Sequence, residues 1–294
     1  MLKERIDRVL MQVVKGAAAE GGPPKLAEAI HHAVFPGGAR VRPQLCLAVA
    51  LANGDDDATL SETFAAALEL MHCASLVHDD LPCFDNAALR RGLPSVHAAY
   101  GERLAVLAGD ALIVMAFRVV IGSRTRHAHR LVSVLTHLEQ SVAPPFGIAA
   151  GQAWECEPRA LLQTYQRSKT GALFAAATAG GAAAAGADPQ VWRGLGEALG
   201  EAYQVADDIR DVLMDAADLG KPANQDLLLD RPSAARELGL EGSFEAFDAL
   251  IAKAIDSIPP CRGAVRLRSM VLKEGERLLP LDLRTHPAAQ REVH

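Results

Sequence analysis

Segments of helical length recur along the whole chain, and glycine and proline residues separate them. Residues 60–80, 103–122 and 191–215 are three such segments. Breaks are expected at 20–25, 35–39, 52–58, 143–147, 180–189 and 222–226. No stretch alternates apolar and polar residues convincingly as a half-buried strand would. Alanine dominates the apolar residues and aromatic residues make up only 4% of the chain, which favours closely packed helices. The sequence therefore predicts an all-α fold.

The length of 294 residues allows one large domain or two small ones. No linker-like stretch divides the chain and no short repeat appears, so we expect one helical domain over residues 1–294, larger than a four-helix bundle. The formal net charge of −6 gives no reason to expect a nucleic-acid partner. An anionic substrate must therefore be held by local cations.

The five cysteines are widely spaced and form no CxxC pair, which is typical of free thiols in a cytosolic protein. The first residues, MLKERIDRVLMQVVKG, carry charges throughout and do not look like a signal peptide. The most apolar run, 104–122, contains Asp110 and Arg118, so we expect a buried core helix there and no membrane span. These features predict a cytoplasmic protein.

The stretch LVHDDLPCFDNAALRRG brings three carboxylates and two arginines together. Asp79 and Asp85 are six residues apart, which on a straight helix turns them roughly 120° away from each other. Pro82 lies between them and can end the helix, so the chain can turn and bring Asp85 back toward Asp79. Arg90 and Arg91 suit phosphate oxygens. A polar helix terminus without a ligand is the alternative interpretation.

A second acidic cluster lies in AYQVADDIRDVLMD. Asp207 and Asp211 are four residues apart and would share one helical face, with Asp208 beside them. Three carboxylates on one helical turn suit Mg²⁺, which usually keeps some of its waters and shares its other positions with phosphate oxygens. The alternative is a solvated helix face on which Arg210 pairs with an aspartate.

Several Mg²⁺ ions and a diphosphate would bridge these two clusters, which are about 128 residues apart in the sequence. Cations at glycine-rich breaks are further candidate ligands for the phosphates. They are Arg40 and Arg42 in GGARVRP, Lys169 in RSKTGAL and Lys221 in LGKP. His72 lies seven residues before Asp79, on nearly the same helical face, and is a candidate for the same site.

Two other charged stretches are expected to be structural. The run 55–57 follows Asn-Gly and precedes a helix, so N-capping explains its three aspartates better than metal binding does. The basic stretch SRTRHAHR (123–130) lacks aromatic residues and predicts a solvated loop. The sequence assigns no role to Trp154 and Glu155 in GQAWE.

The chain resembles the trans-prenyl diphosphate synthases, or polyprenyl synthetases, over nearly its whole length. The shared motifs follow the family's order: GGARVRP, ELMHCASLVHDDLPCFDN, LRRG, LAGDAL, GQAWE, KTGALF, YQVADDIRD and LGKPANQD. It is most similar to the bacterial branch that makes geranylgeranyl diphosphate for carotenoid and bacteriochlorophyll pathways. The resemblance implies an isoprenoid synthase fold, with helices around a central cavity, and a homodimer.

The resemblance also implies roles for individual residues. Three Mg²⁺ ions and the allylic diphosphate would be bound by Asp79, Asp80, Asp85, Asp207, Asp208 and Asp211. The allylic substrate would also contact Arg90, Lys169, Thr170, Gln204 and Lys221. Isopentenyl diphosphate would be held by Arg42, His72 and Arg91.

The implied activity is a Mg²⁺-dependent condensation of isopentenyl diphosphate with allylic diphosphates, up to farnesyl diphosphate, to give geranylgeranyl diphosphate. In this family a bulky aromatic residue five positions before the first aspartate commonly stops elongation at farnesyl. That position is Ala74, next to Ser75, and these small side chains favour a C20 product. A C15 product, and hence a farnesyl diphosphate synthase, is the alternative within the same chemistry.

Two further alternatives concern the class of protein. A class I terpene cyclase would not need a second substrate site, so Arg42, His72 and Arg91 argue against it. A non-catalytic partner subunit is mildly favoured by Ala39 and Gln225, which stand where the family usually has lysines. The six intact aspartates argue against that interpretation.

Overall fold

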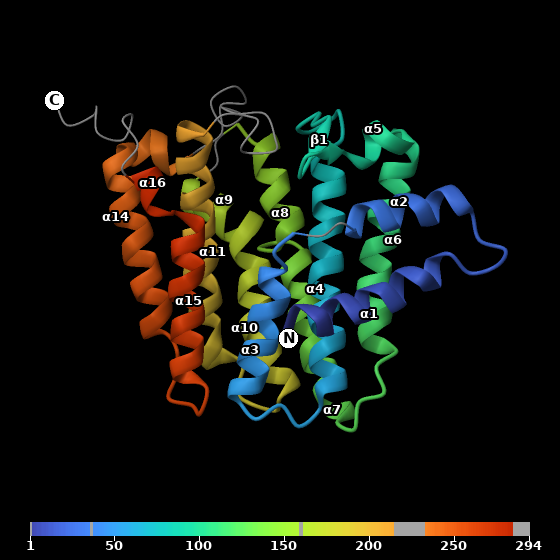
Figure 1. Ribbon diagram of the computed structural model, residues 1–294, viewed down its shortest axis with the longest axis horizontal. Coiled ribbons are helices and arrows are strands. Elements are labelled where there is room, and N and C mark those ends of the chain that lie inside the picture. Colours follow the sequence, from blue (N-terminus) through green and yellow to red (C-terminus); the bar gives the residue numbers. More distant parts are fainter. Residues whose placement is uncertain (1, 36–37, 159–160, 215–232, 285–294) are drawn as a thin grey trace. The chain divides into compact units, whose positions relative to one another are not determined.

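The protein is described by a computed structural model that covers residues 2–35, 38–158, 161–214 and 233–284 (Figure 1). Within these ranges nearly all regular structure is helical, which confirms the all-α prediction. The strands in the described ranges are the two residues of β1 (Leu89–Arg90) and the two residues of β2 (Leu93–Pro94). They pair antiparallel, with Leu89 opposite Pro94 and Arg90 opposite Leu93.

Contacts divide the chain into two compact units, each with buried apolar residues. The first unit comprises Met1–Leu138 and Gly180–Ala187, and the second comprises Glu139–Ala179 and Asp188–His294. The chain passes from one unit to the other within α7 (Ala128–Val142) and within α10 (Ala172–Ala184).

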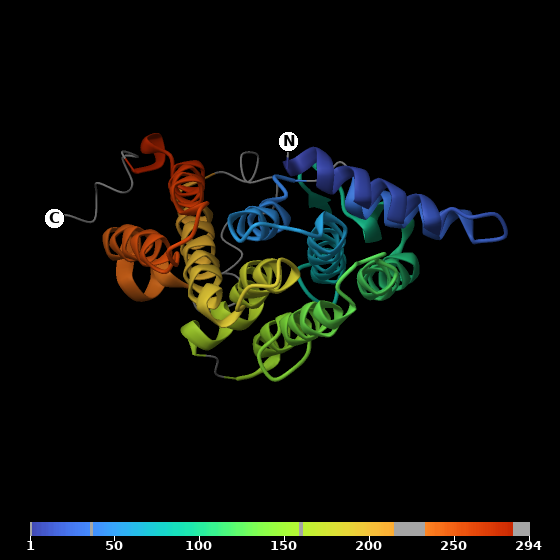
Figure 2. The ribbon, with the colours of Figure 1, turned by 90° about the horizontal axis from the view of Figure 1, so that it is seen from below.

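The first unit is built around a buried helix that ends at the first aspartate motif. Its helices, with the first part of α7 and the last part of α10, are α1 (Leu2–Ala17), α2 (Pro24–Val34), α3 (Val41–Ala52), α4 (Ala58–Asp79), α5 (Val96–Tyr100) and α6 (Glu102–Ile121). Helix α4 packs against α6, α3 and α1, and most of its side chains are buried. Figures 1 and 2 show α1 and α2 crossing α4 and α6. The expected helices over 60–80 and 103–122 are therefore confirmed.

The second unit holds the other aspartate motif on a long helix. Its elements, with the last part of α7 and the first part of α10, are α8 (Ile148–Ala153), η1 (Trp154–Cys156), α9 (Leu162–Gln166), η2 (Arg167–Gly171), α11 (Gln190–Leu213), α14 (Ala234–Asp256), α15 (Ala264–Leu278) and α16 (Leu281–Arg284). Helix α11 packs along α14, and α14 contacts α15 (Figures 1 and 2). The helix expected over 191–215 is confirmed.

The expected break at 180–189 is wrong in its first half, because α10 continues through Gly180 and Gly181 to Ala184. A methyl group on Gly180 would collide with the ring of Phe64, and one on Gly181 would collide with the backbone of Cys46. These glycines therefore allow close contact with α4 and α3 and do not end the helix. The break expected at 222–226 lies outside the described residues.

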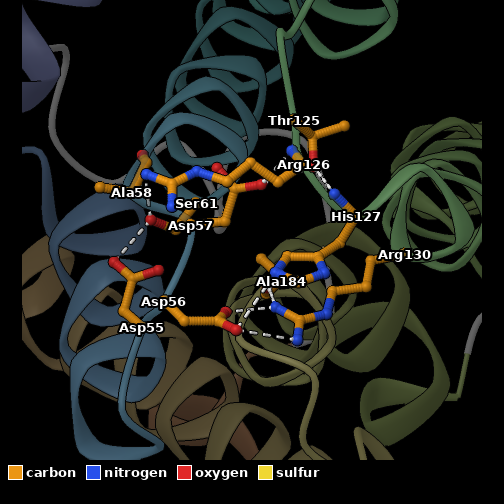
Figure 3. Close-up of polar contacts among 10 residues, drawn as sticks. All are labelled: Asp55, Asp56, Asp57, Ala58, Ser61, Thr125, Arg126, His127, Arg130 and Ala184. Carbon is orange, nitrogen blue, oxygen red and sulfur yellow. Dashed lines mark hydrogen bonds and ion pairs between the residues drawn. The ribbon is translucent and has the colours of Figure 1, made fainter.

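The acidic run 55–57 is bound to the basic stretch 123–130, as Figure 3 shows. Asp57 accepts hydrogen bonds from the Thr125 hydroxyl at 2.6 Å and from the backbone N–H of Arg126 at 2.9 Å. Asp57 does occupy the N-cap position of α4, but its side chain makes no capping hydrogen bond. The N-cap prediction is therefore right for the position and wrong for the role of the carboxylate.

The other two aspartates of this run also have protein partners. Asp56 pairs with Arg130 and lies 3.1 Å from Nε2 of His127. Asp55 accepts a hydrogen bond from the Ser61 hydroxyl at 2.8 Å. The stretch 123–130 is exposed or half-buried throughout, and most of it is a loop, as the sequence predicted. The contacts with residues 55–57 hold this loop at the N-terminal end of α4 (Figure 3).

Helix α6 buries only one side. Among the described helices it is the one that is long and apolar enough to cross a membrane by length and composition, and 39% of its most apolar stretch is buried inside the molecule. Leu107, Val114 and Ile121 are exposed, and their spacing of seven residues places them on one face. The prediction of a buried core helix is therefore correct for one side of α6 and wrong for the other.

Candidate active site

The first aspartate motif is a tight turn at the C-terminal end of α4. The helix ends at Asp79, and the backbone N–H of Asp85 donates to the carbonyl oxygen of Asp79 at 2.9 Å. A second bond, from the N–H of Ala87 to the carbonyl of Asp80 at 3.1 Å, closes the same turn. The chain therefore folds back after Pro82 and returns Asp85 to Asp79, as predicted.

The middle aspartate of this motif pairs with an arginine. Asp80 is 2% exposed, and Nε of Arg90 donates to its two carboxylate oxygens at 2.9 and 3.3 Å, while Nη2 makes an additional contact. Burial raises the pKa of Asp80, and the Arg90 guanidinium acts in the opposite direction. Asp80 thus fixes the orientation of Arg90, while Asp79 and Asp85 are more exposed.

The two arginines stand at the turn between β1 and β2. Arg91 and Gly92 both have positive φ, 55° and 77°, which is the geometry of a two-residue type I′ hairpin turn. The Arg91 guanidinium lies against Gly38, where a methyl group would come within 2.9 Å of Cζ. A glycine in the GGARVRP motif therefore leaves room for Arg91.

The three residues expected to hold isopentenyl diphosphate lie within electrostatic reach of one another. His72 on α4 is partly buried. Withdrawal from water, and then the charges of Arg42 and Arg91, hold the pKa of its imidazole well below 6.5. At neutral pH His72 is therefore an uncharged hydrogen-bonding group, and the two arginines supply the positive charge. A pocket of about 40 Å³ lies beside Arg91, Arg90 and Asp80.

Arg40 has a structural role, so the expectation that it binds a ligand is wrong. Its side chain is buried, and it donates to Glu69 at 2.6 Å, to Asp7 at 3.2 Å and to the backbone carbonyl of Val34 at 2.8 Å. These bonds connect the GGARVRP segment to α4, α1 and α2. Arg40 thus holds the segment from which Arg42 projects.

The second aspartate motif lies on α11, and its middle member is again tied to the protein. Asp208 is 1% exposed and accepts hydrogen bonds from Gln204 at 2.9 Å, from Gln166 at 3.2 Å and from the backbone N–H of Ala234 at 2.6 Å. It therefore joins α11 to α9 and to the start of α14. A buried carboxylate with several donors is a positioning group for the helix.

The outer aspartates of α11 differ from Asp208. Asp207 has a half-exposed side chain and pairs with Arg210, which is the helix-face pair considered as an alternative above. Asp211 is 5% exposed, and its Oδ1 atom is buried without a hydrogen-bond partner among the described residues. A buried carboxylate oxygen in this state is costly unless a cation or donor completes it. This atom fits a site for a hard divalent cation.

The KTG motif forms an unusual turn. Residues Arg167–Gly171 make a π-helical turn, η2, which the sequence did not predict. Thr170 donates to the side-chain carbonyl of Gln204 at 2.9 Å, and Lys169 forms an ion pair with Glu155. The structure therefore links Thr170 through Gln204 to Asp208. Lys221, and with it Gln225, lies outside the described residues.

Sequence reasoning missed three residues of this network: Glu155, Tyr165 and Gln166. Gln166 donates to Asp208, whereas Tyr165 donates to Glu155 at 2.7 Å. The position of Glu155 in the GQAWE motif was the available signal, but a single glutamate indicates no partner.

The two residues considered for chain length lie on α4. Ala74 is buried, and the Ser75 hydroxyl donates to the carbonyl of His72 at 2.9 Å within the same helix. Neither adds bulk to its surroundings, so their geometry is compatible with the chain-length argument.

These features define an all-α protein with two aspartate-rich helical segments and with cationic side chains in both compact units, which is the pattern of Mg²⁺-dependent prenyltransferases. The family model for polyprenyl synthetase matches residues 23–266. The chain belongs to the polyprenyl synthetase family.

Relatives agree over almost the full length of the chain. It is 50% identical over 278 residues to a geranylgeranyl diphosphate synthase of Cereibacter sphaeroides, covering 95% of this chain and 96% of the relative. It is 48% identical over 270 residues to one of Rhodobacter capsulatus, covering 92% and 93%. These similarities favour geranylgeranyl diphosphate synthesis over the alternatives, and the chain is a prenyltransferase of that type.

Solved structures share the fold. A geranyltransferase from Helicobacter pylori, complexed with magnesium and isoprenyl diphosphate, has a TM-score of 0.77 at 29% identity and covers 92% of this chain and 95% of its own. A farnesyl and geranylfarnesyl diphosphate synthase from Zymomonas mobilis has a TM-score of 0.77 at 28% identity, with coverage of 92% and 98%. The isoprenoid synthase fold expected from the resemblance is confirmed.

Proposed function

We propose that this enzyme condenses isopentenyl diphosphate with allylic diphosphates, up to farnesyl diphosphate, and releases geranylgeranyl diphosphate. The observation that carries the assignment is the group of two arginines and an uncharged histidine, Arg42, Arg91 and His72, which is additional to the Lys169 and Thr170 turn. Two groups of phosphate ligands suit two diphosphate substrates, whereas a cyclase needs only one.

The residues divide between the two substrates. Lys169, Thr170, Gln204 and Arg90, with Lys221, contact the allylic diphosphate and stabilise the charge that grows on it as the C–O bond breaks. Arg42 and Arg91 bind isopentenyl diphosphate as charged donors. His72, which is uncharged, contributes one hydrogen bond and orients the substrate.

The carbon chemistry needs no nucleophilic side chain. The C–O bond of the allylic substrate breaks and the diphosphate leaves with the electron pair. The double bond of isopentenyl diphosphate attacks the resulting allylic cation and forms the new C–C bond. Loss of a proton to the released diphosphate then restores an allylic double bond in the longer product.

We assign the metal contacts to Asp79, Asp85, Asp207 and Asp211, because Asp80 and Asp208 are almost fully buried and accept hydrogen bonds from the protein through both carboxylate oxygens. The buried Oδ1 atom of Asp211 supports this division. Mg²⁺, of which we propose three ions when substrate is bound, neutralises the diphosphate and makes it a better leaving group. The other two aspartates of the motifs hold Arg90 and α11 in place.

We propose a C20 product because Ala74 and Ser75 do not add the bulk that would stop elongation earlier. We further propose that residues 1–294 act as one domain, since the family model matches across both compact units. A homodimer is supported by the exposed apolar face of α6. A cytoplasmic location is supported by five cysteines that are all free thiols.

The test incubates the purified protein with isopentenyl diphosphate, Mg²⁺ and each of the C5, C10 and C15 allylic diphosphates, and measures product lengths by mass spectrometry. The expected result is a dominant C20 product that disappears in Asp79→Ala and Asp207→Ala variants. A dominant C15 product would refute the chain-length proposal, and no elongation from any primer would refute the enzyme assignment.

A further inference from the structure

The backbone of the π-helical turn that carries Lys169 is in close contact with two glycines of neighbouring helices. A methyl group on Gly151 of α8 would collide with the N and Cα atoms of Lys169, and one on Gly200 of α11 would collide with Cα of Gly171. Both helices therefore contact the π-helical turn at backbone distance. Single π-helical turns are rare, and they often occur at functional sites.

The side chain of Lys169 is held by a carboxylate that is itself fixed. Glu155 pairs with the Lys169 ammonium through Oε1, and the same oxygen accepts the Tyr165 hydroxyl hydrogen bond at 2.7 Å. The other oxygen, Oε2, accepts from Gln152 at 3.3 Å. The Glu155 side chain is 9% exposed, whereas the Lys169 side chain is 20% exposed. The lysine ammonium also lies 5.7 Å from the centre of the Tyr165 ring.

From this geometry we infer that Glu155 is a positioning residue, which acts on the allylic diphosphate only through Lys169, with Tyr165 and Gln152 as its supports. The inference rests on the proposed role of Lys169 as a diphosphate ligand. A free lysine side chain has several rotatable bonds and loses conformational freedom when it binds. Glu155 removes that freedom before the substrate arrives, so the ammonium is in place as the C–O bond breaks.

The expected kinetic signature is a loss in kcat. When the ammonium is badly placed, the transition state, in which charge grows on the departing diphosphate, loses more stabilisation than the bound substrate does. As a result kcat falls more than KM rises. Glu155→Gln keeps the shape of the side chain and its neutral hydrogen bonds but removes the ion pair. We expect kcat to fall about 10-fold, with the KM for isopentenyl diphosphate unchanged.

A double-mutant cycle tests whether Glu155 acts through Lys169. The four proteins are wild type, Glu155→Gln, Lys169→Met and the double variant, assayed with farnesyl diphosphate and isopentenyl diphosphate at saturating Mg²⁺. Glu155→Gln is expected to lower kcat in the wild-type background and to have no further effect once Lys169 is methionine. An equal loss in both backgrounds, or no loss in either, would overturn the inference.

Two more variants separate positioning from folding. Tyr165→Phe removes only the hydroxyl group that supports Glu155, and a smaller fall in kcat of about 3-fold is expected from the loss of one neutral hydrogen bond. Glu197→Gln is the matched control. Glu197 is another glutamate of this unit that forms ion pairs, with Arg193 at 2.8 Å and with Arg167 at 3.8 Å. The kcat of this variant is expected to be unchanged. A fall in kcat in Glu197→Gln equal to that in Glu155→Gln would overturn the inference.

The cycle also separates this inference from the role proposed for Lys169. If Lys169→Met itself leaves kcat and KM unchanged, the assignment of Lys169 to the allylic diphosphate fails, and the inference fails with it. If Lys169→Met lowers the rate and Glu155→Gln does not, the assignment of Lys169 stands and only the positioning role is refuted. Melting temperatures of all variants show whether any loss in rate comes from unfolding.

Discussion

Asp80 and Arg90 form a buried carboxylate–guanidinium pair at the end of α4, with Nε of Arg90 2.9 Å from one oxygen of Asp80 and 3.3 Å from the other. The pair fixes the orientation of the Arg90 side chain, which projects from the β1–β2 hairpin, and both oxygens of Asp80 accept hydrogen bonds from it. In the proposed function the two adjacent aspartates of this motif therefore have different roles, with Asp79 as the metal ligand.

The first prediction contrasts these neighbours. Asp79→Asn is expected to raise the Mg²⁺ concentration needed for half-maximal activity about 10-fold or more, because it removes a proposed metal ligand. Asp80→Asn is expected to leave that concentration unchanged but to lower the free energy of unfolding by about 3 kcal/mol, since it leaves Arg90 without its partner. Mg²⁺ titrations of activity and urea unfolding measure the two effects. The opposite pattern would show that Asp80 is the metal ligand.

The second prediction concerns pH. The pKa of His72 is well below 6.5 in the folded protein, so below about pH 6.5 the unfolded chain binds a proton that the folded chain does not. The free energy of unfolding is therefore expected to fall with decreasing pH, by up to about 1.4 kcal/mol per pH unit from this group. His72→Asn should flatten this dependence between pH 6.5 and 5. Equal slopes in wild type and His72→Asn would contradict the argument.

The third prediction addresses product length. Ala74→Phe is expected to shift the main product from C20 to C15, because the family resemblance implies that a bulky aromatic residue at this position stops elongation at farnesyl. Since Ala74 is buried, the larger side chain is also expected to cost about 1–3 kcal/mol of stability. Mass spectrometry of the products is the measurement. Ser75→Ala adds no volume and should keep C20. Unchanged C20 from a folded Ala74→Phe protein would place the end of the cavity elsewhere.

The fourth prediction concerns the exposed face of α6. Val114 is 65% exposed among apolar neighbours of the same helix. Val114→Asp is expected to convert a dimer into a monomer, which light scattering after size-exclusion chromatography would detect. Val132 on α7 is 69% exposed, and Val132→Asp is the matched control that should leave the dimer intact. A dimer that persists in Val114→Asp would remove α6 from the interface.

The sequence predicts the parts of this site that depend on local chain geometry. The return of Asp85 to Asp79 follows from the six-residue spacing and from Pro82, and the shared helix of Asp207 and Asp211 follows from a spacing of four. These features need only the pitch of a helix and the effect of a proline, which a single sequence contains.

Other parts depend on distant partners, and the sequence does not reveal them. The three aspartates of the first motif look equivalent in the sequence. In the structure, of the three only Asp80 is buried, and it is paired with Arg90. A glycine pair in a sequence predicts a helix break, but Gly180 and Gly181 lie inside α10, where α4 and α3 pack too closely for a larger side chain. Glu155 has the same difficulty, because its importance lies in a contact with a turn that begins twelve residues later.

Three non-glycine residues of the first unit, Arg40, Asn86 and Arg91, have left-handed backbone angles, with φ of 53°, 47° and 55°. Asparagine tolerates this conformation, but for arginine it costs roughly 1 kcal/mol or more. Glycine at positions 40 and 91 would relax the backbone and would remove two guanidinium groups that anchor or form the substrate site. Efforts to make this enzyme more heat-resistant by relieving strain would therefore trade away catalytic performance at these two positions, and gains in thermostability should be sought far from them.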